Sequence, residues 1–275
     1  MSTLKISNHY MMRGDTSPTA DQLLASVPAI FATSPADNVS NRYGFVSTSN
    51  IIEIMDEAGY RVVQARGGIR QGSRSHGIHE VRLRQVDQKV NLREVFPEIV
   101  LLNSHNATSA AILHMGLYRK ICSNGLVVGE SFETSFRVSH VGDPRENVIQ
   151  AAHHLMESAP RLGETIEQWR SRSLKPSEVI EFGRRAAALR KLPGTALFDD
   201  TARDGAVTGV RRSEDSNNNL WNVFNRTQEN LIGGGIMVAS DKTGRIRRSR
   251  GIRAVKPLIE LNRGLWDLAT EFLPA

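Results

Sequence analysis

Reactive and polar side chains gather between Asn103 and Gly125, a stretch with two of the chain's eight histidines and its only cysteine. A cysteine nucleophile needs a base beside it, and His105 or His114, with Asn103 or Asn124, could complete a Cys-His-Asn set around Cys122. The alternative is structural, because Asn124-Gly125 is typical of a type I′ hairpin turn. We favour the turn and keep the catalytic set as an open alternative.

Other catalytic and metal-binding patterns are weaker. Ser104 and His105 are neighbours at a strand end, so they point to opposite faces and cannot pair as nucleophile and base. His76 and His79 lie three residues apart, but no CxxC or HExxH motif accompanies them. No phosphate-binding GxxxxGK[ST] motif occurs either. We therefore expect no metal and no cofactor, and we favour a function without catalysis.

Basic residues form two dense runs in a chain of formal charge +6 and pI about 9.8. Residues 61–93 contain eight Lys/Arg against two acidic residues, and residues 240–256 contain seven against Asp241. Such runs are typical of surfaces that bind the phosphate backbone, and guanidinium groups also stack on bases. The alternative is a solvated surface. The predicted nucleic-acid contacts are Arg70, Arg74, Arg82, Arg84, Lys242, Arg245, Arg247, Arg248, Arg250 and Arg253.

The elements that must position these side chains change character along the chain. Residues 18–59 predict helices, the second one with a capping box at Asn50 and Glu53 and with Gly59 after its last residue. Residues 60–141 predict an antiparallel sheet of about five strands. In residues 79–86, Glu80, Arg82 and Arg84 fall on one face, which we expect to meet water or a phosphate. The run EIVLLN is continuously apolar, as in a central strand.

Residues 143–275 predict a helical half. A helix starts at Pro144, carries an apolar heptad seam to Trp169 and should kink near Met156 because of Pro160. Residues 238–256 predict a basic loop ordered only by a ligand or partner. Aromatic residues at helical spacing predict core positions, namely Trp221, Phe224, Trp266 and Phe272. The fold class is thus α+β, with the sheet packed by C-terminal helices in a single domain spanning residues 1–275.

Several segments together resemble one family. These are RYGFVSTSNII, PEIVLLNSHNATSAAILHMGLYRKICSNGLVVG, RVSHVGD, NNLWNVFNRTQENLIGGG and NRGLWDLATEF. In this order and spacing they resemble the domain-of-unknown-function family 932, which is found in phages and plasmids. The resemblance implies a gene of a mobile element and implies no activity. One departure is Asn106-Ala107, where the family pattern leads us to expect Asp-Gly.

The sequence supports a main hypothesis and two alternatives. We expect a nucleic-acid-binding protein of mobile elements that prefers single-stranded DNA, anneals it as a homo-oligomer and is not an enzyme. Its two basic runs would converge on one groove. The alternatives are an interaction protein that inhibits a host defence or toxin system, and an enzyme that acts on nucleic acid. The N-terminus lacks a signal-peptide pattern and no run of 18 apolar residues occurs, so we expect a cytoplasmic protein without a membrane segment.

Overall fold

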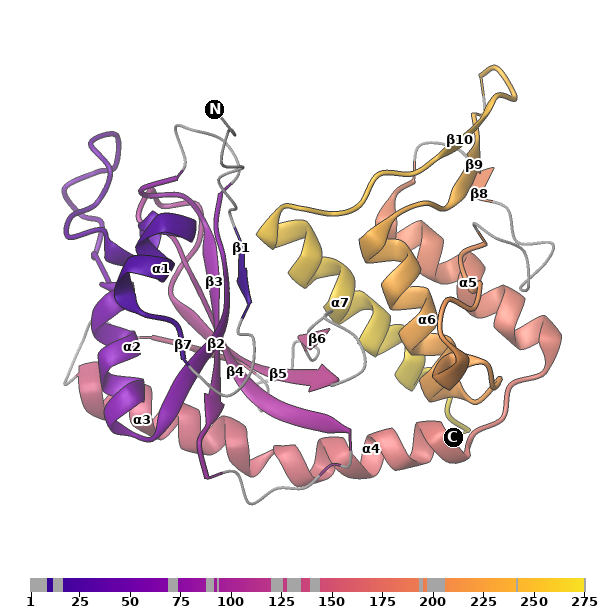
Figure 1. Cartoon of the computed structure of the whole chain (residues 1–275), viewed down its shortest axis with the longest axis horizontal. Helices are drawn as coiled ribbons and strands as arrows, with labels where there is room; N and C mark the ends of the chain where they lie inside the picture. Colours follow the sequence, from indigo (N-terminus) through magenta and orange to yellow (C-terminus); the bar gives the residue numbers. More distant parts are fainter. Residues whose placement is uncertain are drawn as a thin grey trace. The chain divides into compact units, whose positions relative to one another are not determined.

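The computed structural model describes residues 9–11, 17–68, 74–87, 92, 94–119, 126–127, 135–138, 144–192, 195–196, 206–240 and 242–274. Its fold is α+β, as the sequence predicts, with an antiparallel sheet and separate helices (Figure 1). The chain groups into two compact units, and the single domain expected from the sequence stays a prediction. The first unit comprises residues 1–120, 130–159 and 254–256, and the second comprises residues 121–129, 160–253 and 257–275.

The first unit is built on the antiparallel sheet, with strand order β1-β2-β3-β4-β5 and with β7 also paired to β5. The central strand β4 lies between β3 and β5, and residues 97–103 are buried, which agrees with its continuous apolar run. The bounds are β1 (His9–Met11), β2 (Tyr60–Arg66), β3 (His79–Gln85), β4 (Val95–Asn103), β5 (Ile112–Arg119) and β7 (Ser135–Arg137).

Helices of the first unit cover one face of this sheet. They are α1 (Ala20–Ser26), the 3₁₀ helix η1 (Pro28–Phe31), α2 (Thr48–Glu57) and α3 (Pro144–Glu157). α2 packs on β2, and α3 packs on β4 and β5. The N-cap of α2 is Ser47, whose Oγ accepts a hydrogen bond from the backbone nitrogen of Asn50 at 3.2 Å, so the predicted cap at Asn50 was wrong. Gly59 follows the helix with φ +85°, as predicted.

The predicted kink in the long C-terminal helix is a complete break. α3 ends at Glu157, and α4 (Ala159–Ser171) begins one residue before Pro160. A proline tolerates the first turn of a helix but not its interior, so the chain starts a new helix there. All seven residues of the predicted apolar seam are buried, from Val148 in α3 to Trp169 in α4.

The second unit is mostly helical and packs around aromatic rings. Its helices are α4, α5 (Pro176–Arg190), α6 (Leu220–Gly233), most of α7 (Val255–Thr270) and the 3₁₀ helix η4 (Ser213–Asp215). The two-residue strand β6 (Leu126–Val127) belongs to the same unit. The Trp169 ring lies 4.5 Å from Trp266 and 5.2 Å from Phe224 between centroids, and Trp221 is also buried. Trp221, Phe224 and Trp266 therefore form core, as predicted, whereas Phe272 is only half-buried.

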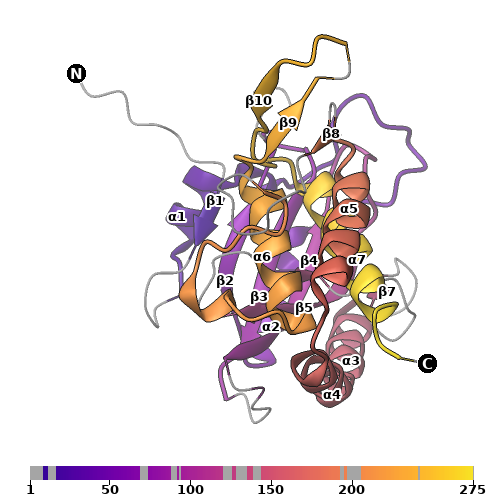
Figure 2. The same cartoon turned by 90° about the vertical axis from the view of Figure 1, so that its right-hand side faces the viewer.

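A small sheet completes the second unit. Its strands are β8 (Thr195–Ala196), β9 (Met237–Ala239) and β10 (Ile246–Arg248), in the order β10-β9-β8. The hairpin of β9 and β10 projects beyond α5 and α6 of its own unit (Figures 1 and 2). Within the described residues, no helix combines the length and the apolar character needed to cross a membrane.

Candidate nucleic-acid interface

The second basic run forms an ordered hairpin rather than the loop that the sequence predicted. β9 and β10 pair antiparallel, with Ile246 opposite Ala239 and Arg248 opposite Met237. The turn is closed by backbone bonds from Ser240 to Arg245 and from Gly244 to Ser240. We call β9, its turn, β10 and the extended segment to Arg253 the basic arm. The backbone of Arg247 and Arg248 is therefore held by strand pairing.

Every cation of the basic arm is exposed to solvent. The set is Lys242, Arg245, Arg247, Arg248, Arg250 and Arg253. No Asp or Glu occurs in the sequence between Lys242 and Ile259, so the arm has no carboxylate of its own after the turn. Among the described residues, Lys242, Arg245, Arg250 and Arg253 form no ion pair. The arm therefore presents a locally uncompensated positive charge, which attracts a polyanion.

The root of the arm is a close crossing of two backbone segments. A Cβ atom on Gly234 would lie 2.6 Å from the backbone nitrogen of Gly251, and a Cβ on Gly251 would lie 2.9 Å from the carbonyl oxygen of Gly233. The backbone nitrogen of Gly235 donates to the carbonyl of Ser249 at 2.8 Å, and Ile252 donates to Ile232 at 2.8 Å. Only glycine permits this approach, which fixes the arm to the end of α6.

Two arginines outside the arm hold its root by hydrogen bonds. The Nη2 of Arg211 donates to the carbonyl of Gly234 at 2.5 Å, and the Nη2 of Arg190 donates to the carbonyl of Arg250. Arg248 itself donates through Nη1 to the carbonyl of Gly235 at 3.2 Å. These bonds satisfy carbonyl oxygens that the glycine crossing leaves outside regular pairing.

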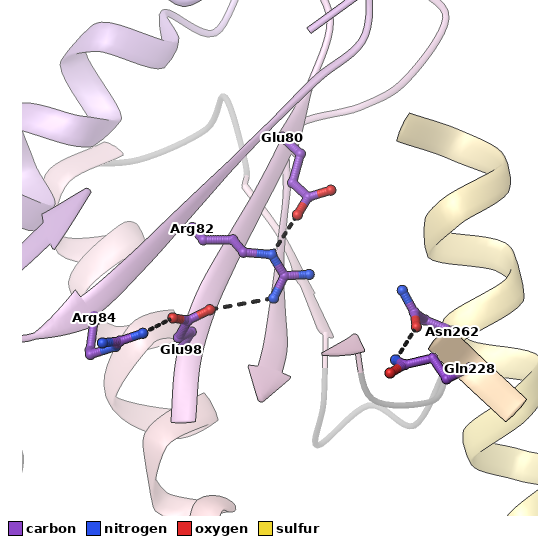
Figure 3. A network of polar contacts seen from close by, with 6 residues as sticks. All are labelled: Glu80, Arg82, Arg84, Glu98, Gln228 and Asn262. Atoms are coloured by element: carbon purple, nitrogen blue, oxygen red, sulfur yellow. Dashed lines mark hydrogen bonds and ion pairs between the residues drawn. The ribbon is translucent and has the colours of Figure 1, made fainter. Parts of the chain in front are cut away.

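The first basic run differs, because its arginines on β3 belong to an internal ion network. Arg82 Nε lies 2.6 Å from a Glu80 oxygen, and Arg82 Nη1 lies 3.4 Å from Glu98 on β4. Arg84 Nη2 lies 2.6 Å from the other Glu98 oxygen (Figure 3). Glu80, Arg82 and Glu98 are each 1% exposed. The expectation that this strand face meets water or a phosphate is therefore corrected.

Arg84 is also held by aromatic rings. Its guanidinium carbon lies 4.9 Å from the ring centroid of Phe96 and 4.8 Å from that of Tyr118. Register places all three side chains on the face that carries Glu98. Cation–π contacts of this kind stabilise a partly desolvated guanidinium, so they fix Arg84 beside Glu98.

The other described arginines of the first run also have partners within the protein. Arg61 pairs with Asp56 at 2.6 Å, and Arg74 is half-buried, with its Nη2 donating to the carbonyl of Ala25 at 3.5 Å. Arg66 is surrounded by protein, and burial lowers its pKa while Glu80 raises it. Arg70 lies outside the described residues. Among the described residues the two runs thus differ, because Arg82 of the first run is buried in ion pairs whereas the arginines of the basic arm are exposed.

The polar stretch after β4 forms a buried cluster around one hydroxyl. Thr48 Oγ1 lies 2.8 Å from Nε2 of His79 and 3.3 Å from Nε2 of His105, and Asn103 Nδ2 donates to it at 2.9 Å. His79 Nδ1 lies 2.9 Å from the carbonyl of Gly77, so this nitrogen carries the proton and Nε2 accepts from the hydroxyl. Burial lowers the pKa of His79 to about 3 and that of His105 to about 4.

Most polar atoms of this cluster bond to one another or to the backbone, which favours a structural role. Asn103 also donates to the carbonyl of Val46 at 2.9 Å, which ties the end of β4 to the start of α2. Ser104 Oγ donates to the carbonyl of Ser109 and accepts from its backbone nitrogen, so it closes a turn. Cys122 and its predicted turn lie outside the described residues. Among the described residues, no group of three His, Cys, Asp or Glu side chains is arranged to hold a metal.

Buried polar side chains on α6 were missed by sequence reasoning. Gln228 Nε2 donates to Asn262 Oδ1 at 2.6 Å, a pair also drawn in Figure 3. Asn230 Nδ2 donates to the carbonyls of Val207 and Gly209. Both asparagines and the glutamine are at most 2% exposed. A polar residue in a helix usually indicates a solvated face, so the pattern gave no signal of this burial.

Comparison with known proteins places the chain in a family. Residues 35–266 match the family model described as "Domain of unknown function (DUF932)". The chain belongs to this family. Two relatives from Escherichia coli (strain K12) are similar to this chain: UPF0380 protein YafZ at 33% identity and UPF0380 protein YfjQ at 32% identity. Each similarity extends over 268 residues, which are 96% of this chain and 94% of the relative. No solved structure matches. The resemblance noted in the sequence is confirmed, and DUF932 membership names no activity.

Proposed function

We propose that this DUF932 protein binds nucleic acid through the basic arm, without catalysis. The observation that carries the proposal is the ordered hairpin with six exposed cations and no carboxylate from Lys242 to Ile259. Counterions released from a phosphate backbone favour binding to such a surface. The fixed root adds to affinity, because an arm ordered before binding loses less conformational entropy on contact.

The composition of the arm supports a duplex partner better than a single strand. Proteins that bind single strands use aromatic side chains on which bases stack. The arm contains no Phe, Tyr or Trp, and the tryptophans Trp169, Trp221 and Trp266 are buried. Arginines on a two-stranded ribbon suit the phosphates and grooves of a duplex. We therefore propose DNA duplex as the main ligand and retain single-stranded DNA, with homo-oligomeric annealing, as an outcome of the test.

Fluorescence anisotropy tests the proposal with labelled 30-nucleotide single strands and 30-base-pair duplexes at 50 mM salt. The full-length protein is expected to bind, and the double variant R247A/R248A should bind about 10-fold more weakly for each lost phosphate contact. The matched control is R184A, because Arg184 is an exposed arginine of α5 in the same unit and pairs with Glu181 at 2.6 Å. Its affinity should stay near that of the wild type.

Two results would contradict this function. One is the absence of binding to either DNA at 50 mM salt. The other is an equal loss in R184A and R247A/R248A, which would indicate attraction by net charge alone. A protein recovered from host lysate on the basic arm after nuclease treatment, with no DNA binding, would support the inhibitor alternative instead.

A further inference from the structure

The basic arm carries one large apolar side chain in the open. Ile246, at the start of β10, is 51% exposed and lies between Arg245 and Arg247. The other β-branched aliphatic residues nearby behave differently, since Val238 of β9 is 1% exposed and Ile236, which precedes β9, is fully buried. An exposed isoleucine costs free energy in water unless a partner covers it. Its position among cations suits a partner that is anionic outside and apolar inside.

The register shows how Ile246 is presented. It stands opposite Ala239, whose methyl group is too small to cover it, and β10 is the outer strand of its sheet. Side chains alternate along a strand, so Arg245 and Arg247 point to the face opposite Ile246, while Arg248 shares its face. Guanidinium groups therefore lie next to Ile246 on both faces of β10.

The crossing of Gly234 and Gly251 gives this side chain a firm base. A side chain that enters between stacked bases must be held firmly, because the bases tend to stack again and push it out. The carbonyls of Gly234 and Arg250 accept hydrogen bonds from Arg211 and Arg190, so side chains from elsewhere in the second unit also hold the root of the arm. A loosely attached loop would bend away instead.

We propose that Ile246 is an apolar wedge that enters the minor groove of duplex DNA and partly unstacks one base step, while the neighbouring arginines hold the flanking phosphates. This inference rests on the proposed function and names its substrate class. Aliphatic side chains inserted from the minor groove unstack base steps and kink a duplex by tens of degrees. Pyrimidine–purine steps such as TA unstack most easily, so they define the preferred sites.

Energy transfer between dyes at the two ends of a 30-base-pair duplex with central TA steps tests the wedge. At saturating wild-type protein, transfer should rise because the ends approach. I246A should leave transfer at the level of free DNA, bind several-fold more weakly, and keep the wild-type salt slope, because isoleucine neutralises no phosphate. I246M should restore the rise, since methionine also acts as a wedge.

The matched control is I180A, the same substitution at a 41% exposed isoleucine of α5. Its energy transfer should equal that of the wild type. The wedge is overturned if the wild type binds the duplex and leaves the energy transfer unchanged. It is also overturned if I246A raises the energy transfer as much as the wild type does. In both cases the proposed DNA-binding function stands. If the wild type binds no DNA at 50 mM salt, the proposed function itself fails. Preferred binding of a single strand without bending of the duplex also overturns the wedge.

Discussion

Gly234 and Gly251 lie so close that neither has room for a side chain: a Cβ on Gly234 would meet the Gly251 nitrogen at 2.6 Å. Gly234 also has φ +77° and ψ −159°, a conformation that is accessible almost only to glycine. The two residues join the C-terminal end of α6 to the segment that follows β10. This crossing is the structural basis for the fixed direction of the basic arm.

Substitution G234A should therefore destabilise the protein and detach the arm. We expect a loss of more than about 2 kcal/mol, because the unfavourable backbone conformation adds to the overlap with Gly251. Thermal unfolding gives the stability, and limited proteolysis after the arm's arginines reports its detachment. The control is G244A at the hairpin turn, with φ +64° and nothing within 4 Å of its Cβ, which should cost only about 1 kcal/mol. Equal stability of G234A and the wild type would disprove the crossing.

The ion network on β3 and β4 yields a second prediction. R82A should destabilise the protein by about 3–5 kcal/mol, because it leaves Glu80 and Glu98 as buried charges without their shared cation. R61A should cost less than about 1 kcal/mol, since its pair with Asp56 is 42% and 54% exposed. Denaturant unfolding measures both losses. An R82A protein of wild-type stability with a lower salt slope for DNA would show that Arg82 contacts phosphate after all.

Ala107 provides a third prediction. It has φ +60°, a left-handed conformation that costs free energy for a residue with a Cβ. Asn106 Oδ1 accepts from the hydroxyl of Thr108 at 2.6 Å, so the pair forms a side-chain-closed turn. The Asp-Gly pair expected at these positions thus has a structural reason. A107G should raise the free energy of unfolding by up to about 1 kcal/mol. The control is A188G at an exposed alanine of α5, which should lower the free energy of unfolding by about 0.5–1 kcal/mol. A destabilised A107G contradicts the strain.

The buried histidines yield a pH-dependent prediction. In the folded state burial lowers the pKa of His79 to about 3 and that of His105 to about 4, below the ordinary value near 6.5. The unfolded chain then binds more protons between pH 6.5 and 4, so stability is complete above pH 6.5 and falls as the pH decreases through this window. Each histidine contributes a slope of up to about 1.4 kcal/mol per pH unit.

Denaturant unfolding between pH 7.5 and 4.5 checks this dependence. H79Q removes one of the two titrating groups, so the slope of stability against pH should fall to about half that of the wild type. T48V should keep the slope and lower stability at pH 7 by about 1–3 kcal/mol, because the central hydroxyl is lost. A flat profile in the wild type would mean that the histidines are accessible to water.

Periodicity and caps predicted most of the secondary structure of the chain. The break at Pro160, the end of α6 at Gly233 and the central strand β4 follow from local rules on proline, glycine and apolar runs. The cap of α2 at Ser47 was missed, because two candidates with similar spacing compete and only the hydrogen-bond geometry separates them.

The candidate site was predicted only in part, because charge density does not reveal neutralisation. Arg82 and Arg248 look alike in sequence, each in a basic run with β-forming neighbours. Glu98 reaches Arg82 from a strand that follows by more than ten residues, and this pairing depends on register. The sequence from Lys242 to Ile259 contains no Asp or Glu, and among the described residues Lys242, Arg245, Arg250 and Arg253 form no ion pair. The register of β3 against β4, which composition does not reveal, brings Glu98 to Arg82 and so distinguishes the first run from the second.

The salt dependence of duplex binding decides whether the basic arm is the nucleic-acid interface. The logarithm of the affinity should fall linearly with the logarithm of the salt concentration, by about 0.9 for each phosphate contacted. Replacing Arg245, Arg247, Arg250 and Arg253 together with alanine should lower the slope by about three to four units, while R82A, to the extent that it folds, leaves the slope unchanged. A quadruple variant with the wild-type slope would contradict the basic arm as the nucleic-acid interface.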